Sequence, residues 1–190
     1  MNKAELLKIA KPILFSTPMV KALLNGTKTE TRRPVKFAIR NQAGAFLDSK
    51  YNEVKPPYQK GDILYVRETW CQFPSNAPDG MGENLYYRAD QKDLDTSKTV
   101  MSRNGVHWRP SVHMPKEAAR IFLEVTEVKV ERVHDITNDG AAKEGISCFC
   151  MDEPRILFSD LWESVYAKRG YGWNKNPYVW VMLWLLLIKY

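Results

Sequence analysis

Apolar and polar positions alternate along much of this chain with the two-residue period of β-strands. The run Arg120–Val133 places Ile, Leu or Val at every second or third position between charged residues, which is typical of a strand. The C-terminal run Tyr178–Ile188 is rich in Val, Trp and Leu and follows Pro177, which favours a buried strand. The strands that this pattern predicts are 13–15, one starting at or soon after Thr29, 63–67, 85–88, 120–133 and 178–188.

Other segments carry the start and stop signals of helices. Ser16 or Thr17 can cap a helix that runs to Leu24, with Pro18 in its first turn and Gly26 as its left-handed end. Two further helices are predicted, one at 139–146, capped by Thr137 or Asn138, and one at 155–167, where apolar residues recur at helical spacing.

Short strands outnumber helices in this order, and a helix intervenes between the first two strands. The pattern predicts an α+β fold, a small and mainly antiparallel β-barrel with short helices packed around it. We expect residues 12–190 to form one domain, preceded by a flexible lead-in at 1–11. Three polar stretches interrupt the pattern and are predicted to be long loops: 36–60, 71–84 and 90–107.

The charge of the chain indicates which kind of partner to expect. The chain has 190 residues and a formal charge of +6, from 28 Lys and Arg against 22 Asp and Glu. Such a balance favours anionic partners such as RNA, DNA or nucleotides. The 3 cysteines form no CxxC pair and the 3 histidines have no paired spacing, so we expect reduced thiols, no metal and no cofactor.

Neither end of the chain has the features of a targeting or membrane segment. The N-terminal apolar run is too short for a signal peptide, and 178–188 is about half the length of a membrane-spanning helix. We therefore expect a cytoplasmic protein without a membrane segment, and we favour a monomer.

The densest group of polar residues is GTKTETRR, residues 26–33. If Gly26 bends the chain, Lys28 lies in the turn while Thr29 and Thr31 share one face of the following strand, and Lys28 and Thr31 can then converge. A lysine beside a hydroxyl forms a nucleophile–base pair once the ammonium group loses its proton.

The same residues permit a simpler interpretation. Arg32 and Arg33 are fixed cations suited to phosphate, but a strand at the edge of a sheet also carries charges that only face solvent. The pattern alone leaves both interpretations open.

At this motif the sequence resembles the ASCH superfamily, whose domains are relatives of the PUA fold, and specifically its longer phage and prophage branch. The similar blocks follow one another in family order and cover most of the chain: 12–33, GDILYVRETW at 61–70, LYYRAD at 85–90, 108–125, 130–146 and 161–182. The resemblance implies a bacterial or phage protein with a PUA-like β-barrel, helices beside it and a cleft over which residues 26–33 lie.

The resemblance also implies a chemistry. Small bacterial relatives are amidohydrolases that deacetylate N4-acetylcytidine with a Lys, a Thr and a Glu, and their motif places these roles on Lys28, Thr31 and Glu144. Thr31 would attack the acetyl carbonyl while a neutral Lys28 takes its proton. Glu144 would protonate the leaving amine or activate water for the second step.

The substrate and the class of function stay open. This chain is about twice the length of those relatives, and its extra loops can reshape the cleft. The alternatives are a non-catalytic module that binds RNA or a modified base, and a ribonuclease. In each case the partner is a nucleoside or RNA, and the expected binding residues are Thr29, Arg32, Arg33, Arg67, Trp70, Trp108, Arg109 and Trp173.

Overall fold

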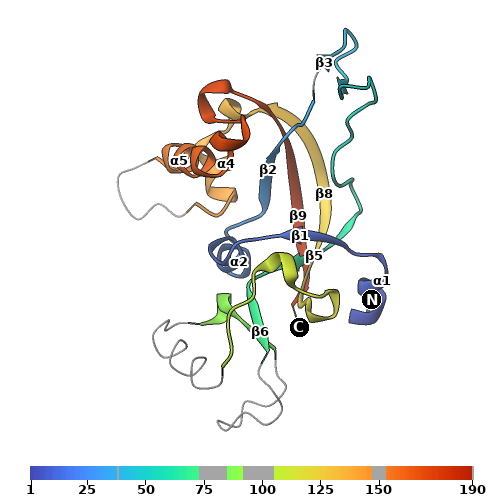
Figure 1. Ribbon diagram of the computed structural model, residues 1–190, viewed down its shortest axis with the longest axis vertical. Helices are drawn as coiled ribbons and strands as arrows, with labels where there is room; N and C mark the ends of the chain where they lie inside the picture. The colour runs from blue at the N-terminus through green and yellow to red at the C-terminus, as the bar shows by residue number, and fades with distance from the viewer. Residues whose placement is uncertain (38, 73–84, 92–104, 147–152, 190) are drawn as a thin grey trace. The chain divides into compact units, whose positions relative to one another are not determined.

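The structure is a computed structural model that describes residues 1–37, 39–72, 85–91, 105–146 and 153–189. The chain divides into two compact units, whose helices and strands are labelled in Figure 1. The first unit comprises Met1–Leu24, Ile63–Leu123 and Leu186–Tyr190, and the second comprises Asn25–Asp62 and Glu124–Leu185. None of the described helices is both long enough and apolar enough to span a membrane.

The largest sheet has five strands in the order β1-β5-β8-β9-β2. Strand β8 belongs to the first unit up to Leu123 and to the second from Glu124, and strand β9 belongs to the second unit up to Leu185 and to the first from Leu186. Strand β1 pairs with β5 in parallel, and β2 pairs with β9 antiparallel. The strand bounds are Lys11–Leu14 for β1, Glu30–Pro34 for β2, Ile63–Arg67 for β5, Ile121–Arg132 for β8 and Tyr178–Lys189 for β9.

The α+β class predicted from the sequence is confirmed, but the described strands do not close into a barrel. The outermost strands of the sheet are β1 and β2, and in the described part of the chain β1 pairs only with β5 and β2 only with β9. A closed barrel requires every strand to have two neighbours, so the described sheet is open. The sheet is mixed, because the β1–β5 pair is parallel and the β2–β9 pair is antiparallel.

The first unit is built on helix α1 (Lys3–Ile9), helix α2 (Thr17–Leu24) and the ribbon of β6 (Trp70–Gln72) with β7 (Leu85–Tyr87). Residues 3–9, which fall in the expected flexible lead-in, form a helix with a capping box between Asn2 and Glu5. Leu6 of this helix is buried in an apolar cluster with Tyr65, Trp70, Met114, Ala118 and Phe122. Among the described residues of this unit, the short 3-10 helices are η1 (Arg88–Asp90), η2 (Ser111–His113) and η3 (Lys116–Ala118).

The second unit packs helices α4 (Asn138–Lys143) and α5 (Pro154–Tyr166) over its strands. Its apolar core consists of Val133, Ile136, Ala141, Phe158, Trp162, Val179 and Val181. The predicted loop 36–60 contains a two-stranded antiparallel ribbon of β3 (Ile39–Arg40) and β4 (Phe46–Leu47). The remaining short elements are η4 (Val133–Asp135), η5 (Ala167–Arg169) and η6 (Trp173–Lys175).

Helices α2, α4 and α5 agree with the sequence pattern, whereas helix α1 was not predicted. Helix α2 has the predicted bounds, and Gly26 two residues after it has φ of 76°, as the predicted left-handed end requires. Most of the predicted loops 71–84 and 90–107 lie outside the described residues.

Candidate functional site

Lys28 lies in the second unit, between Gly26 and the start of β2. The backbone of this segment is hydrogen-bonded to neighbouring segments on both sides. The Lys28 backbone forms an isolated antiparallel bridge with Glu144. The next residue, Thr29, donates from its amide to Lys143 O at 2.8 Å and accepts from Trp184 N at 3.1 Å. These bonds fix the backbone of Lys28 between the end of α4 and β9.

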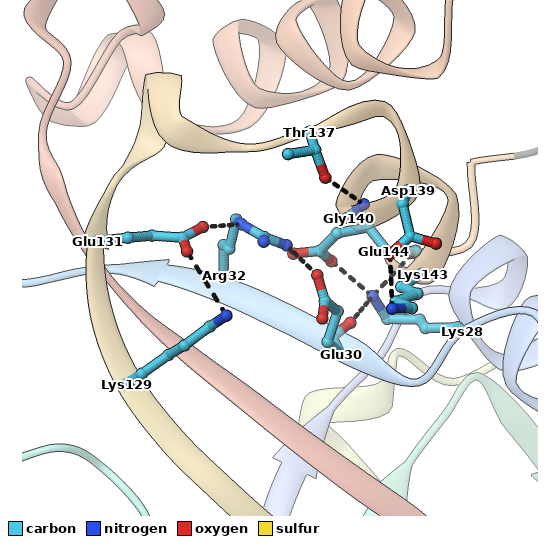
Figure 2. A network of polar contacts seen from close by, with 10 residues as sticks. All are labelled: Lys28, Glu30, Arg32, Lys129, Glu131, Thr137, Asp139, Gly140, Lys143 and Glu144. Carbon is cyan, nitrogen blue, oxygen red and sulfur yellow. Dashed lines mark hydrogen bonds and ion pairs between the residues drawn. The ribbon is translucent and has the colours of Figure 1, made fainter.

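The ammonium group of Lys28 is buried and hydrogen-bonded to three acceptors. Nζ donates to the main-chain oxygen atoms of Glu30 and Glu144, both at 2.9 Å, and to Glu144 Oε2 at 2.7 Å. The side chain of Lys28 has 0% exposure and that of Glu144 has 7%, so the ion pair is shielded from water. Three acceptors match the three N–H donors of a protonated lysine. Figure 2 shows this arrangement.

Helix α4 places Glu144 opposite Lys28. The hydroxyl of Thr137 accepts from Gly140 N at 3.1 Å, which caps the first turn of the helix. Glu144 is the residue at the C-terminal cap, and its amide is bonded to the last carbonyls of the helix. A short helix with a defined start therefore fixes where its last side chain lies.

Arg32 joins the ion pair to two further carboxylates. Its Nη1 is 2.6 Å from Glu30 Oε1 and 3.5 Å from Glu144 Oε1, and its Nε is 2.7 Å from Glu131 Oε1. Burial on its own would lower the pKa of Arg32, but the carboxylates of Glu144, Glu30 and Glu131 raise it above its ordinary value. The guanidinium is therefore a permanent charge within the cluster.

The cluster is almost balanced in charge. Lys28 and Arg32 face the carboxylates of Glu30, Glu131 and Glu144, and the more exposed Lys129 lies 3.9 Å from Glu131 Oε2. The contacts run in a continuous line from the buried Lys28 to Lys129 at the surface (Figure 2). Buried charges are tolerated in proteins when they are paired in this way.

Thr31 differs from the other two expected catalytic residues in its position. It lies between Glu30 and Arg32 in β2, and successive side chains of a strand leave opposite faces, so its hydroxyl leaves the face away from the charged cluster. In the described residues the Thr31 hydroxyl makes no hydrogen bond to Lys28 or Glu144. The structure thus brings Lys28 and Glu144 into contact. Thr31 takes no part in this contact, although it directly follows Glu30, whose main-chain oxygen accepts from Lys28 Nζ.

The other expected binding residues of the motif differ from one another in burial and in their partners. Thr29 is exposed, Arg32 belongs to the buried cluster, and Arg33 is half-buried in register with Trp180 of β9. Arg32 is therefore held by carboxylates of its own chain.

Four of the expected binding residues lie in the first unit, whereas Lys28 and Glu144 belong to the second. Trp70 is buried and the guanidinium of Arg109 lies 5.1 Å from its ring centroid. Trp108 is half-buried and faces Arg88 at 5.8 Å, and Arg67 Nη2 donates to Val112 O. Trp70 is thus a core residue of its unit.

Trp173, the remaining expected residue, packs within the second unit. Its ring lies 4.6 Å from that of His134 and 6.2 Å from that of Phe158, and Arg155 stacks on it at 5.5 Å. Its amide donates to Glu163 Oε2 at 2.6 Å. These contacts account for the tryptophan without a bound base.

Sequence reasoning missed Glu30 and Glu131, which complete the charged cluster. Glu30 is two residues from Arg32, the spacing that places both on one face of a strand, and that signal was present in the sequence. Glu131 lies on β8, separated from β2 by β9 in the sheet, and no local pattern predicts that neighbour.

Comparisons with known proteins give similarity only at the level of solved structures. No protein-family model matches the chain, and no curated protein matches it. The structure is similar to the crystal structure of an ASCH domain from Lactobacillus crispatus, with 11% identity and a TM-score of 0.44 over 90% of this chain and 70% of that chain. It is also similar to a protein from Enterococcus faecalis, with 8% identity and a TM-score of 0.48 over 96% of this chain and 82% of that chain.

Proposed function

We propose that this protein is an amidohydrolase that acts on N4-acetylcytidine or a related acylated nucleoside. The observation that carries the proposal is the buried contact of 2.7 Å between Lys28 Nζ and Glu144 Oε2, residues 116 positions apart in the chain. The resemblance of residues 26–33 and 130–146 to ASCH amidohydrolases supplies the substrate class.

The ion pair is suited to acid–base chemistry because its two members can exchange one proton. Transfer of a proton from Lys28 Nζ to Glu144 Oε2 over 2.7 Å converts the ion pair into a neutral amine and a neutral carboxylic acid. The amine can then accept a proton from a nucleophile, and the acid can donate one to a leaving group.

The proposed nucleophile is the Thr31 hydroxyl. Lys28 Nζ is bonded to Glu30 O, the carbonyl of the peptide that joins Glu30 to Thr31, so the amine lies beside the backbone of Thr31. The Thr31 side chain leaves the other face of β2, so the mechanism requires that substrate binding brings Oγ1 to Lys28 Nζ. Oγ1 would then form a bond with the acetyl carbonyl carbon while its proton passes to the neutral Lys28. Collapse of the adduct breaks the C–N bond, and Glu144 donates its proton to the departing amine nitrogen, which restores the ion pair.

The second half of the reaction releases the acetyl group. A water molecule attacks the acetyl ester on Thr31, its proton is taken up by the Lys28–Glu144 pair, and the alkoxide of Thr31 leaves and recovers a proton. Acetate and free enzyme result. Glu30 and Glu131 take no part in proton transfer here, and they hold Arg32, whose charge stabilises the Glu144 carboxylate between steps.

One observation favours a second candidate, a nucleic-acid-binding module in which the cluster is purely structural. All three donors of the Lys28 ammonium are used by acceptors of the same chain, an arrangement that is complete without a substrate. In that case Lys28 and Glu144 stabilise the fold and perform no chemistry.

Turnover separates the two candidates. Purified protein is incubated with N4-acetylcytidine, and cytidine release is followed by chromatography, alongside Thr31→Val and Thr31→Ser variants. Val has nearly the shape of Thr and lacks its hydroxyl, so the variant removes the nucleophile, and circular dichroism verifies that it folds. The proposal predicts turnover in wild type and Thr31→Ser and none in Thr31→Val. If the wild type releases no cytidine, the amidohydrolase proposal fails and the binding module is the candidate that remains.

A further inference from the structure

The turn formed by Asn25 and Gly26 brings together two groups that can react with each other. These residues directly follow Leu24, the last residue of α2, and they are the first residues of the second unit. The side-chain amide of an asparagine can be attacked by the backbone nitrogen of the next residue. Glycine favours this attack because it has no side chain to hinder the approach and its backbone rotates most freely. The sequence of the turn therefore permits a reaction within the chain.

The surroundings of the turn are open. Asn25 and Gly26 are both exposed, so water has access to the two reacting groups. A Cβ atom built on Gly26 would have nothing within 4 Å apart from its neighbours in the chain. No packed side chain therefore opposes the rotation of this peptide that closing a ring requires.

Hydrogen bonding does not hold the two groups apart. Among the described residues, no hydrogen bond uses the backbone N–H of Gly26 or the side-chain amide of Asn25. Gly140, which follows Asp139 in α4, shows the opposite case, because it is buried and its N–H donates to Thr137 Oγ1 at 3.1 Å. A nitrogen in that position must break a hydrogen bond before it can react, whereas the nitrogen of Gly26 need not.

The reaction is an intramolecular substitution at the side-chain carbonyl carbon, which proximity of the two groups accelerates. The backbone nitrogen of Gly26 forms a bond with Cγ of Asn25 and loses its proton to water. The bond from Cγ to the side-chain nitrogen breaks, and this nitrogen takes up a proton and leaves as ammonia. Water then opens the resulting succinimide ring at either carbonyl. Opening at Cγ gives aspartate, and opening at the main-chain carbonyl gives isoaspartate.

Two other exposed asparagines of the second unit, Asn41 and Asn52, lack this combination. Asn41 Oδ1 accepts from Ala45 N at 2.9 Å, and Asn52 Nδ2 donates to Asp48 Oδ2 at 3.2 Å. Neither asparagine precedes a glycine. The Asn-Gly dipeptide recurs at 104–105, but residue 104 lies outside the described residues. Within the described part of the second unit, Asn41 and Asn52 therefore serve as internal controls for Asn25.

We propose that Asn25 is a site of spontaneous deamidation, which converts it to aspartate and isoaspartate through a succinimide formed with Gly26. The product carries a carboxylate in place of a neutral amide, so the formal charge of +6 falls by one unit. The isoaspartate form also lengthens the main chain by one atom, in the segment that leads to Lys28. The proposal concerns the turn alone and holds whether or not Lys28 and Glu144 catalyse a reaction.

Incubation of the folded wild type in mildly alkaline buffer tests the proposal. Samples taken over several days are digested at acidic pH, and the peptides are mapped by chromatography and mass spectrometry. The peptide that contains Asn25 should be replaced progressively by two products of equal mass, the aspartate and isoaspartate forms. The peptides that contain Asn41 and Asn52 should stay unchanged in the same digest. The map also separates any reaction at 104–105 from reaction at Asn25.

Asn25→Gln is the matched control variant, because glutamine keeps the amide but must close a larger and slower ring. No product should form at this position in the variant. A synthetic peptide with the sequence of residues 21–31 reports the reaction in the absence of the fold. Conversion of Asn25 in the folded protein at a rate similar to that in the peptide supports the proposal. If Asn25 stays intact in the folded protein while the peptide reacts, the fold protects the turn and the proposal is overturned. Neither readout requires release of cytidine.

Discussion

The guanidinium of Arg32 lies directly against the backbone of Gly140. A Cβ atom built on Gly140 would be 3.0 Å from Arg32 Nη2 and 3.3 Å from both Glu30 Oε1 and Ile136 Cγ1. The φ of Gly140 is not in the left-handed region, so its backbone would permit any residue. A Cβ atom at this position would therefore be crowded, and Arg32 or Glu30 would have to move by a few tenths of an ångström to admit it.

We predict that Gly140→Ala destabilises the protein by about 1–3 kcal/mol, the range for overpacking at a close contact. The new methyl group must displace either Arg32 or Glu30, both of which are held by short ion pairs. Denaturant unfolding of the two proteins measures the difference. At an uncrowded helical position the same change stabilises by about 0.4–1 kcal/mol, so a gain in stability would contradict the account.

Arg32 and Arg33 should respond differently to replacement by lysine. Arg32 bonds two carboxylates through different nitrogen atoms, Nη1 and Nε, whereas the single ammonium of lysine has no such fork. We expect Arg32→Lys to lower the free energy of unfolding by about 2 kcal/mol, and Arg33→Lys to lower it by less, because the Arg33 side chain leaves the other face of β2 from the charged cluster. Equal effects at the two positions would show that the network contributes nothing to stability.

The Lys28–Glu144 pair should show strong energetic coupling. Removing one partner from a buried ion pair typically costs about 3–5 kcal/mol because the other charge is left without compensation. We predict that Lys28→Met and Glu144→Leu each destabilise on this scale and that the double variant is markedly more stable than their sum predicts. A thermodynamic cycle from urea unfolding measures the coupling, and additive effects would contradict a direct interaction.

Cys71 should be unreactive in the folded protein. Burial raises the pKa of its thiol to about 11, with the guanidinium of Arg109 opposing the shift. At pH 8 about one thiol in a thousand is then ionised, and alkylation requires the thiolate. In a variant with Cys148→Ser and Cys150→Ser, iodoacetamide should modify Cys71 only after denaturant is added.

The same shift has a consequence for stability. The pKa of Cys71 is higher in the folded state than its ordinary value of 9.0, so the unfolded chain loses its thiol proton first as the pH rises. The contribution of Cys71 to the free energy of unfolding is therefore complete below pH 9 and is lost as the pH rises through about 11. Rapid alkylation of Cys71 in the folded protein would contradict both statements.

Local signals in the sequence were sufficient for helices α2, α4 and α5, but not for helix α1, which lies in the expected flexible lead-in, or for the ribbon in the second unit. Helix α2 could be predicted because Pro18 and Gly26 mark its ends, and α5 because its apolar residues recur at helical spacing. The strands β3 and β4 have two residues each, which is too short for any period to be visible. Their turn is held instead by hydrogen bonds between Asn41, Gly44 and Ala45.

The sheet and the site depend on contacts that no local pattern contains. A barrel and an open sheet can have the same strand order in sequence, and the difference is whether β1 and β2 meet as neighbours. Glu131 reaches Arg32 across β9, so its partner is determined by the order of the strands in the sheet. The partnership of Lys28 with Glu144 was implied by family resemblance, since the two residues are 116 positions apart.

The rate of cytidine release from N4-acetylcytidine tests the central claim most directly, measured with purified wild type, Glu144→Gln and Thr31→Val. Gln keeps the shape of Glu144 and one acceptor for Lys28, but it cannot take a proton from Lys28. Circular dichroism verifies separately that each variant is folded. The account predicts turnover by the wild type, a fall of at least about 100-fold in folded Glu144→Gln, and loss of activity in Thr31→Val. Wild-type turnover that both folded variants retain would contradict it.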